Sequence, residues 1–203
     1  MILASGSPRR RQLLEEAGFS LAVLPADVDE TPLPGESPER LVERLAALKA
    51  AASLAAAKAA AGTIVLGADT IVWIDGEKLG KPASDYEARA MLRRLSGRSH
   101  HVSTGVCLLV AAGDGTATAK RSFVETTKVT FHNLSDAEID AYVASKEPAD
   151  KAGSYGIQGL GRLFVDGIDG DYFNVVGLPV ARVAREIATL TGHDGLDYLL
   201  AGN

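Results

Sequence analysis

One apolar stretch limits the folds open to this chain more than any other feature. Residues 63–74 (TIVLGADTIVWI) are rich in β-branched side chains and run into Asp75-Gly76, a dipeptide typical of a tight hairpin turn. The alanine- and leucine-rich residues 37–61 precede this stretch and begin with Ser-Pro, which predicts a long helix. A helix that leads into a strand with a hairpin return favours a mixed α/β sheet over a purely parallel one.

The remaining elements are predicted from the same periodicities and turn signals. We expect strands at residues 2–4, 21–24, 101–110, 122–131 and 163–165, and helices at 8–17, 85–95, 135–144 and 178–190. The residues expected on the inward face of the helix at 85–95 are Tyr86, Ala90, Met91 and Leu95. The last ten residues show no clear element. Because no repeat or linker divides the chain, the sequence predicts one α/β domain over residues 1–203, a mixed twisted sheet with flanking helices.

Composition excludes several functional classes. With 46% hydrophobic and 23% charged residues, the chain is not of the disordered type. Its 21 basic and 26 acidic residues give a net charge of −5, so it has no overall field for binding nucleic acid. It has no long uncharged apolar run, and its single cysteine, Cys107, suits a reducing compartment. We expect a cytoplasmic domain with neither nucleic acid nor membrane as a partner.

A first candidate site is the Ser5-Gly6-Ser7-Pro8-Arg9-Arg10 segment between a predicted strand and helix. Small residues let a phosphate approach the backbone, the helix start offers unpaired N–H groups, and arginines add bidentate donors. The alternative is a capped helix start with solvated arginines. The segment alone leaves both interpretations open.

Two acidic residues form the second candidate. Asp69 is expected at the end of an apolar strand, a usual place for a metal ligand or a general base, or else as a turn residue between two strands. Glu30 lies in a proline-rich acidic loop, where it could be the second carboxylate for a hard cation such as Mg²⁺ or simply a solvated acid.

Two lysines form the third candidate. Lys81 stands between a glycine and a proline, which stiffen the backbone around a fixed cation. Lys49 lies on the long predicted helix in apolar surroundings, where it either extends along the surface to reach solvent or turns inward toward a phosphate. Spacing does not separate these two alternatives.

The fourth candidate is the glycine-rich segment 150–159 (DKAGSYGIQG), which combines an aromatic ring with an amide. This composition suits recognition of a nucleobase better than a phosphate cradle, with an irregular surface loop as the alternative. His100 and His101 are adjacent and point to opposite faces of a strand, which is poor metal geometry. Cys107 is expected in the core, and the absence of a GxSxG motif gives no support for acyl hydrolysis.

Taken together, these segments resemble the Maf family of nucleoside triphosphate pyrophosphatases. The matching segments follow one order along nearly the whole chain and are LASGSPRR, DET, GADTIV, GKP, DKAGSYGIQG and GDYFNVVGLP. The resemblance implies an α/β fold with two lobes around a central cleft, related to inosine triphosphate pyrophosphatases. It also implies cleavage of a nucleoside triphosphate between its α- and β-phosphates with a divalent cation, Mg²⁺ or Mn²⁺.

The resemblance also implies roles for individual residues. The positions that match the family's phosphate-facing and catalytic residues are Ser7, Arg10, Glu30, Lys49, Asp69 and Lys81. Asp69 matches the proton acceptor, and Glu30 and Asp69 match the carboxylates that hold the metal. Arg9, Thr70 and Gln158 match positions that set substrate specificity in the subgroup acting on dTTP and UTP.

We therefore expect hydrolysis of dTTP and UTP to the nucleoside monophosphate and pyrophosphate, which would also remove modified nucleotides from the pool. Two alternatives stay open: a nucleotide-binding regulator of cell division, and a pyrophosphatase for modified purine nucleotides such as 7-methyl-GTP. The sequence also leaves open whether the chain forms a homodimer.

Overall fold

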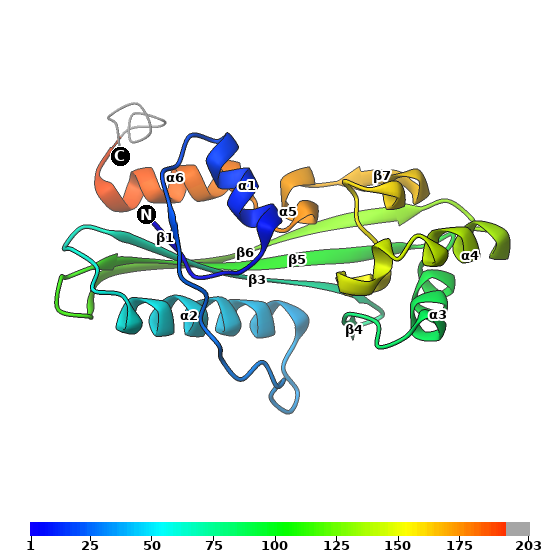
Figure 1. The fold of residues 1–203 in the computed structure, drawn as a ribbon, viewed down its shortest axis with the longest axis horizontal. Helices are drawn as coiled ribbons and strands as arrows, with labels where there is room; N and C mark the ends of the chain where they lie inside the picture. The colour runs from blue at the N-terminus through cyan, green and yellow to red at the C-terminus, as the bar shows by residue number, and fades with distance from the viewer. Residues whose placement is uncertain (194–203) are drawn as a thin grey trace. The chain divides into compact units, whose positions relative to one another are not determined.

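The computed structural model describes residues 1–193, which form a seven-stranded sheet flanked by helices (Figure 1). The strands lie in the order β2-β1-β3-β5-β6-β7, and β4 pairs with β3. Their bounds are β1 Ile2–Leu3, β2 Ala22–Val23, β3 Ile64–Ile74, β4 Glu77–Leu79, β5 Ser99–Ala111, β6 Ala117–Phe131 and β7 Val165–Asp169. β1 pairs in parallel with β2 and β3, whereas the β3–β4 and β6–β7 pairs are antiparallel. The predicted mixed α/β class is confirmed.

Six α-helices and three short 3₁₀ helices are described within residues 1–193. They are α1 Pro8–Glu16, α2 Pro38–Ala56, α3 Asp85–Leu95, α4 Asp136–Ala144, α5 Tyr172–Val176, α6 Val180–Thr191, η1 Glu147–Asp150, η2 Ala152–Ser154 and η3 Leu160–Phe164. No helix in this part of the chain combines the length and apolar character that crossing a membrane requires.

The chain divides into two compact units. The first unit holds residues 1–69, 104–125 and those from 177 onward, and the second holds residues 70–103 and 126–176. The boundary between the units falls within strands β3, β5 and β6, so each of these strands has residues in both units. A single domain over residues 1–203, with two lobes around a cleft, stays a prediction, and the featureless tail predicted for the last ten residues lies outside the described residues.

In the first unit, α2 lies on one face of the sheet, while α1 and α6 lie on the other (Figure 1). Two glycines allow α2 to approach the strands closely. A Cβ atom on Gly67 of β3 or Gly105 of β5 would clash with the carbonyl oxygen of Ala46 or Val42 in α2. Only glycine fits these two positions, and the close contact fixes the height of α2 above the strands.

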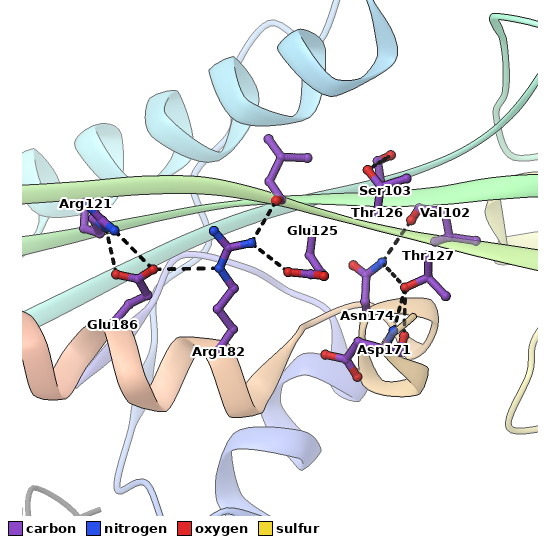
Figure 2. Close-up of polar contacts among 11 residues, drawn as sticks. Val102, Ser103, Arg121, Glu125, Thr126, Thr127, Asp171, Asn174, Arg182 and Glu186 are labelled. Atoms are coloured by element: carbon purple, nitrogen blue, oxygen red, sulfur yellow. Dashed lines mark hydrogen bonds and ion pairs between the residues drawn. The ribbon is translucent and has the colours of Figure 1, made fainter. Parts of the chain in front are cut away.

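A chain of ion pairs holds α6 against β6 in the first unit (Figure 2). Arg182 Nη1 lies 2.7 Å from Glu125, and its guanidinium lies 4.3 Å from the centroid of the Phe123 ring. Glu186 pairs with Arg121 at 2.7 Å and lies 3.8 Å from Arg182. The network joins two elements of the core scaffold, and we assign it no chemical role.

In the second unit, a buried asparagine anchors α5 to the sheet. The Asn174 amide donates to the carbonyl of Val102 at 2.9 Å and to Thr127 Oγ1 at 3.0 Å (Figure 2). Thr127 Oγ1 in turn donates to the carbonyl of Asp171. These bonds give the GDYFNVVGLP segment, which resembles the family, a clear role in packing. Helix α5 itself was not among the predicted elements.

The long helix ends earlier than predicted, at Ala56 rather than near Ala61. Ala57 is already extended, with ψ of 134°. Gly62 donates its backbone N–H to Ala111 at the end of β5, which commits the intervening residues to the approach to β3. Pairing with the sheet therefore overrides the high helix propensity of this alanine-rich stretch.

The inward face predicted for α3 is confirmed for Met91 and Leu95, which are buried, and is wrong for Tyr86 and Ala90. Tyr86 is 80% exposed and Ala90 is also exposed, whereas the buried residues are Ala88, Met91, Leu92 and Leu95. In an α-helix, two residues correspond to about 200° of rotation. Tyr86 and Ala90 each lie two positions from Ala88, so they face away from the packed side.

The strand predicted at residues 163–165 begins later than expected. Residues 160–164 form η3, in which Leu163 is 72% exposed, and β7 starts at Val165. The reason is that β6 pairs with residues 165–169. The expected place of Cys107 in the core is confirmed, since it is fully buried. His100 is also fully buried, whereas His101 stacks on Trp73.

Candidate active site

The turn before α1 is built by its own serines. Ser7 is the N-cap, and its Oγ accepts a hydrogen bond from the backbone N–H of Arg10 at 3.4 Å. Ser5 Oγ accepts from the backbone N–H of Ser7 at 3.3 Å, and Pro8 occupies the first helical turn. The capped helix start is confirmed, whereas the solvated arginines of that alternative are wrong for Arg10, which is buried. Phosphate binding by Ser7 stays a prediction.

Arg10 is only 8% exposed, unusually deep for an arginine. Its Nε donates to the carbonyl of Gly177 at 2.9 Å, and its Nη1 donates to Ser5 Oγ at 3.0 Å and to the carbonyl of Ala68 at 2.9 Å. Burial lowers the pKa of the guanidinium, while the neighbouring Asp69 carboxylate acts in the opposite direction. The charge is thus held rigidly beside the strand that carries Asp69.

Lys49 of α2 joins the two predicted carboxylates. Its Nζ lies 2.7 Å from Asp69 Oδ1 and 2.6 Å from Glu30 Oε1. The side chains of Lys49 and Asp69 are only 13% and 18% exposed, whereas that of Glu30 is 60% exposed. Lys49 has therefore turned toward the carboxylates rather than extended to solvent.

The position of Asp69 differs from both interpretations of the sequence. It lies inside β3, which continues from Ile64 to Ile74, and neither ends the strand nor forms a turn. Its neighbours in the chain, Ala68 and Thr70, belong to the same strand. A carboxylate fixed in the middle of a sheet has little freedom, which suits a group that must meet a reacting atom in one orientation.

Glu30 and Asp69 provide carboxylate oxygens that converge on one cation, the Lys49 ammonium. Within residues 1–193, no group of three or more His, Cys, Asp or Glu side chains forms a complete metal cage. Mg²⁺ commonly binds through one or two carboxylates, waters and substrate phosphates. The donor set thus fits a divalent cation that completes its coordination with substrate.

In the second unit, the structure brings two predicted segments together. The backbone N–H of Gly153, in the glycine-rich loop, donates to the carbonyl of Gly80 at 3.1 Å. Lys81 follows Gly80, is exposed, and forms no ion pair within residues 1–193. The segment that carries this free cation is therefore tied to the loop predicted to recognise a base.

Gln158 lies in that loop and is half-buried. Within residues 1–193 its side-chain amide forms no hydrogen bond, so both its donor and its acceptor are available to a ligand. Within the same loop, Tyr155 provides a buried anchor, because its OH lies 2.8 Å from Nε2 of the fully buried His100.

The structure thus assigns the predicted site residues to the two units. The first unit holds Ser7, Arg9, Arg10, Glu30, Lys49 and Asp69, and the second holds Thr70, Lys81 and Gln158. In the first unit, Arg10 is coupled electrostatically to Arg9, Glu30 and Asp69. Sequence reasoning missed Glu147 and Tyr142, whose contacts with the loop are described below.

Comparison with known proteins places the chain among its relatives. Residues 1–190 match the family described as Maf-like protein. A dTTP/UTP pyrophosphatase of Bacillus cereus (strain AH820) is 52% identical over 187 residues, covering 92% of this chain and 93% of the relative. The dTTP/UTP pyrophosphatase of Bacillus mycoides (strain KBAB4) is 51% identical with the same coverage. The resemblance expected from the sequence motifs is confirmed, and the chain belongs to the Maf-like family.

Proposed function

We propose that this protein is a nucleoside triphosphate pyrophosphatase that hydrolyses dTTP and UTP to the nucleoside monophosphate and pyrophosphate. Relatives with about half of their residues identical over nearly the whole chain bear the name dTTP/UTP pyrophosphatase. The observation that carries the proposal is the convergence of Lys49, Asp69 and Glu30, with the buried Arg10 coupled to both carboxylates.

Positive charge is the first requirement of this reaction, because water must attack a phosphorus atom that carries anionic oxygens. Lys49 is held in place by ion pairs on an apolar helix, and Lys81 has no competing carboxylate within the described residues. We assign both ammonium groups to the phosphate oxygens, where they stabilise the charge that develops in the transition state. Ser7 and Arg10 are assigned to the same phosphate chain.

Asp69 is assigned as the proton acceptor. Its Oδ1 faces Lys49, and no hydrogen bond within residues 1–193 occupies Oδ2. In the proposed step, the water oxygen forms a bond to phosphorus at the α–β anhydride while the bond to the bridging oxygen breaks. The water proton passes to the Asp69 carboxylate, and pyrophosphate leaves.

A divalent cation, Mg²⁺ or Mn²⁺, is assigned to Glu30 and Asp69. When bound, such a cation neutralises phosphate charge and orients the phosphate chain. Lys49 Nζ lies 2.6 Å from Glu30 and 2.7 Å from Asp69. It thereby keeps the two carboxylates that would hold the cation close together. Arg9, Thr70 and Gln158 are assigned to substrate selection, with Gln158 reading the edge of uracil or thymine.

We further propose that the protein acts in the cytoplasm, in agreement with its single cysteine, which is buried and unpaired.

The test is product analysis with purified protein, Mg²⁺ or Mn²⁺, and a panel of UTP, dTTP, CTP and 7-methyl-GTP. We expect UMP and pyrophosphate in equal amounts from UTP, a preference for UTP and dTTP, and loss of turnover with EDTA that added metal restores. Stoichiometric orthophosphate and UDP would contradict the assigned bond. A preference for 7-methyl-GTP would favour the modified-purine alternative, and tight nucleotide binding without turnover would favour the regulatory one.

A further inference from the structure

Glu147, at the start of η1, accepts three hydrogen bonds, two of them from the backbone that follows Gln158. Its Oε2 accepts from the backbone N–H of Leu160 at 2.8 Å, and its Oε1 accepts from the backbone N–H of Gly161 at 3.3 Å. The third bond comes from the hydroxyl of Tyr142 in α4 at 2.9 Å. One carboxylate therefore fixes the backbone just after Gln158.

Tyr142 fixes the backbone on the other side of Gln158. It is 4% exposed, and its hydroxyl accepts a hydrogen bond from the backbone N–H of Gly156 at 3.1 Å while donating to Glu147. Within the loop, the backbone N–H of Gly159 donates to the carbonyl of Gly156 at 3.2 Å, which closes a turn around Gln158. Both ends of this short turn are thus bound to the same Tyr142–Glu147 pair.

The loop also packs directly against the carboxylate. A Cβ atom on Gly159 would collide with all three atoms of the Glu147 carboxyl group, so any other residue there would displace this carboxylate from its present position. At Gly161, a Cβ atom would lie 2.8 Å from the Tyr142 hydroxyl oxygen. The two glycines let the backbone reach the carboxylate and the hydroxyl closely enough to bond to them.

The electrostatics keep Glu147 as an acceptor. Burial alone would raise its pKa, but the hydrogen bonds from Leu160, Tyr142 and Gly161 outweigh burial and hold the pKa below its usual value. An ionised carboxylate only accepts hydrogen bonds, so it suits a position surrounded by three donors.

Gln158 needs such support because an amide can bind a base edge in two ways. Uracil presents an N3–H donor beside the O4 acceptor, whereas cytosine presents the reverse pattern. By exchanging its oxygen and nitrogen, a freely rotating glutamine could satisfy either base. Because the Gln158 amide has no hydrogen bond within the described residues, its side chain does not hold itself in place, and the backbone sets its position.

We propose that Glu147, together with Tyr142, is a positioning residue for base selection. It holds residues 156–161 in one conformation, so that Gln158 meets uracil or thymine in the productive orientation. This inference rests on the proposed function and deepens it, because it names what makes the loop selective.

The test uses Glu147→Gln, which keeps the shape but turns one acceptor into a donor that faces other donors. We expect the ratio of kcat/KM for UTP to that for CTP to fall about tenfold, mainly through KM for UTP, while kcat for UTP changes by less than about threefold. Tyr142→Phe should shift the ratio in the same direction. Asp140→Asn, which breaks the pair between Arg89 of α3 and Asp140 of α4, should leave the ratio unchanged and is the control.

Hydrogen exchange of the loop amides gives a readout that does not depend on catalysis. We expect faster exchange at residues 156–161 in Glu147→Gln and Tyr142→Phe than in the wild type or Asp140→Asn. Unchanged exchange would overturn the inference, as would an unchanged UTP:CTP ratio in variants whose loop exchanges faster. If the wild type cleaves no nucleotide to pyrophosphate, the proposed function fails and this inference fails with it. A selective wild type with an equally selective Glu147→Gln overturns this inference alone.

Discussion

The charged group of the first unit (Arg10, Lys49 and Asp69) and the glycine-rich loop of the second unit are held in place by different means. Arg10, Lys49 and Asp69 project from a helix or a strand, and each is fixed by side-chain bonds within the scaffold. The Gln158 side chain has no such bonds within residues 1–193, and only the backbone around it is fixed, by Glu147.

The two tasks of the proposed reaction make different structural demands. Charge stabilisation needs fixed groups that do not reorganise as the phosphorus reacts, and regular elements supply them. Base selection needs a polar group that is free to bind the ligand but is held in one orientation. A loop with open side chains and a fixed backbone meets that demand. Substitutions in the charged group should therefore act on turnover and stability, and substitutions in the loop on base preference.

The largest effect is expected in the charged group, from Asp69→Asn. Asparagine keeps the size but is not a base, so kcat for UTP should fall roughly 10²–10⁴-fold, with little change in the folded structure. Steady-state kinetics with circular dichroism checks both expectations. Asp75→Asn, in the exposed β3–β4 turn where Asp75 pairs with Arg98, is the matched control and should keep its activity. A near wild-type kcat in Asp69→Asn would show that Asp69 has no part in the chemistry.

The second effect concerns the rigidity of the same region. In Arg10→Lys, one ammonium replaces a guanidinium that serves three oxygen acceptors from separate segments. Lysine does not reproduce that fork, and we expect the free energy of unfolding to fall by about 2–3 kcal/mol in urea titrations. Arg11→Lys, on the exposed side of α1, is the control and should change stability little. Equal stability of the two variants would refute the anchoring role of Arg10.

The third prediction moves to the loop. Gln158→Ala should lower the ratio of kcat/KM for UTP to that for CTP about tenfold, because one base-reading group is lost, and should leave kcat for UTP nearly unchanged. Kinetics with both nucleotides at matched metal concentration measure this ratio. If the preference persists, Gln158 is not the reader, and Arg9 or Thr70 becomes the residue to test.

At neutral pH the smallest effect is expected at His100, the anchor beneath the loop, and this effect grows as the pH falls. Burial, with a smaller contribution from His101, lowers its pKa to about 3. Since an unfolded histidine titrates near pH 6.5, the unfolded chain binds a proton below that pH while the folded chain does not. Its contribution to stability is therefore complete above pH 6.5 and is lost by about 1.4 kcal/mol per pH unit as pH falls toward 3.

Urea titrations between pH 7 and pH 4.5 check this prediction. His100→Asn keeps a polar group near Tyr155 but removes the titration, so its stability should fall less steeply with acid than that of the wild type. Parallel pH dependences in the two proteins would contradict the buried, neutral state of His100.

Much of the fold could be predicted from the sequence because local signals and tertiary structure agree there. Ser7, Ser37 and Ser135 cap helices as their positions predict, and Asp75-Gly76 forms the hairpin turn. Predictions failed where packing decides. The end of α2 is set by pairing of Gly62 with β5, and the start of β7 is set by pairing with β6.

The candidate site shows the same division. Residue types and spacing alone left Asp69 between a turn residue and a functional carboxylate, and only the resemblance favoured one of them. Lys49 pairs with both Asp69 and Glu30 and so joins residues far apart in the chain, a contact that no periodicity encodes. No sequence motif pointed to Glu147, because it binds backbone N–H groups, and these are present at nearly every residue whatever the side chain.

The separation of tasks is tested most directly by one kinetic comparison. The rate kcat for UTP and the UTP:CTP ratio of kcat/KM are measured in the wild type, Asp69→Asn, Gln158→Ala and the double variant. We expect Asp69→Asn to lower kcat and keep the ratio, Gln158→Ala to lower the ratio and keep kcat, and the double variant to show both changes additively, as independent groups do. Loss of the UTP preference in Asp69→Asn, or a fall of kcat in Gln158→Ala as large as that in Asp69→Asn, would contradict the account.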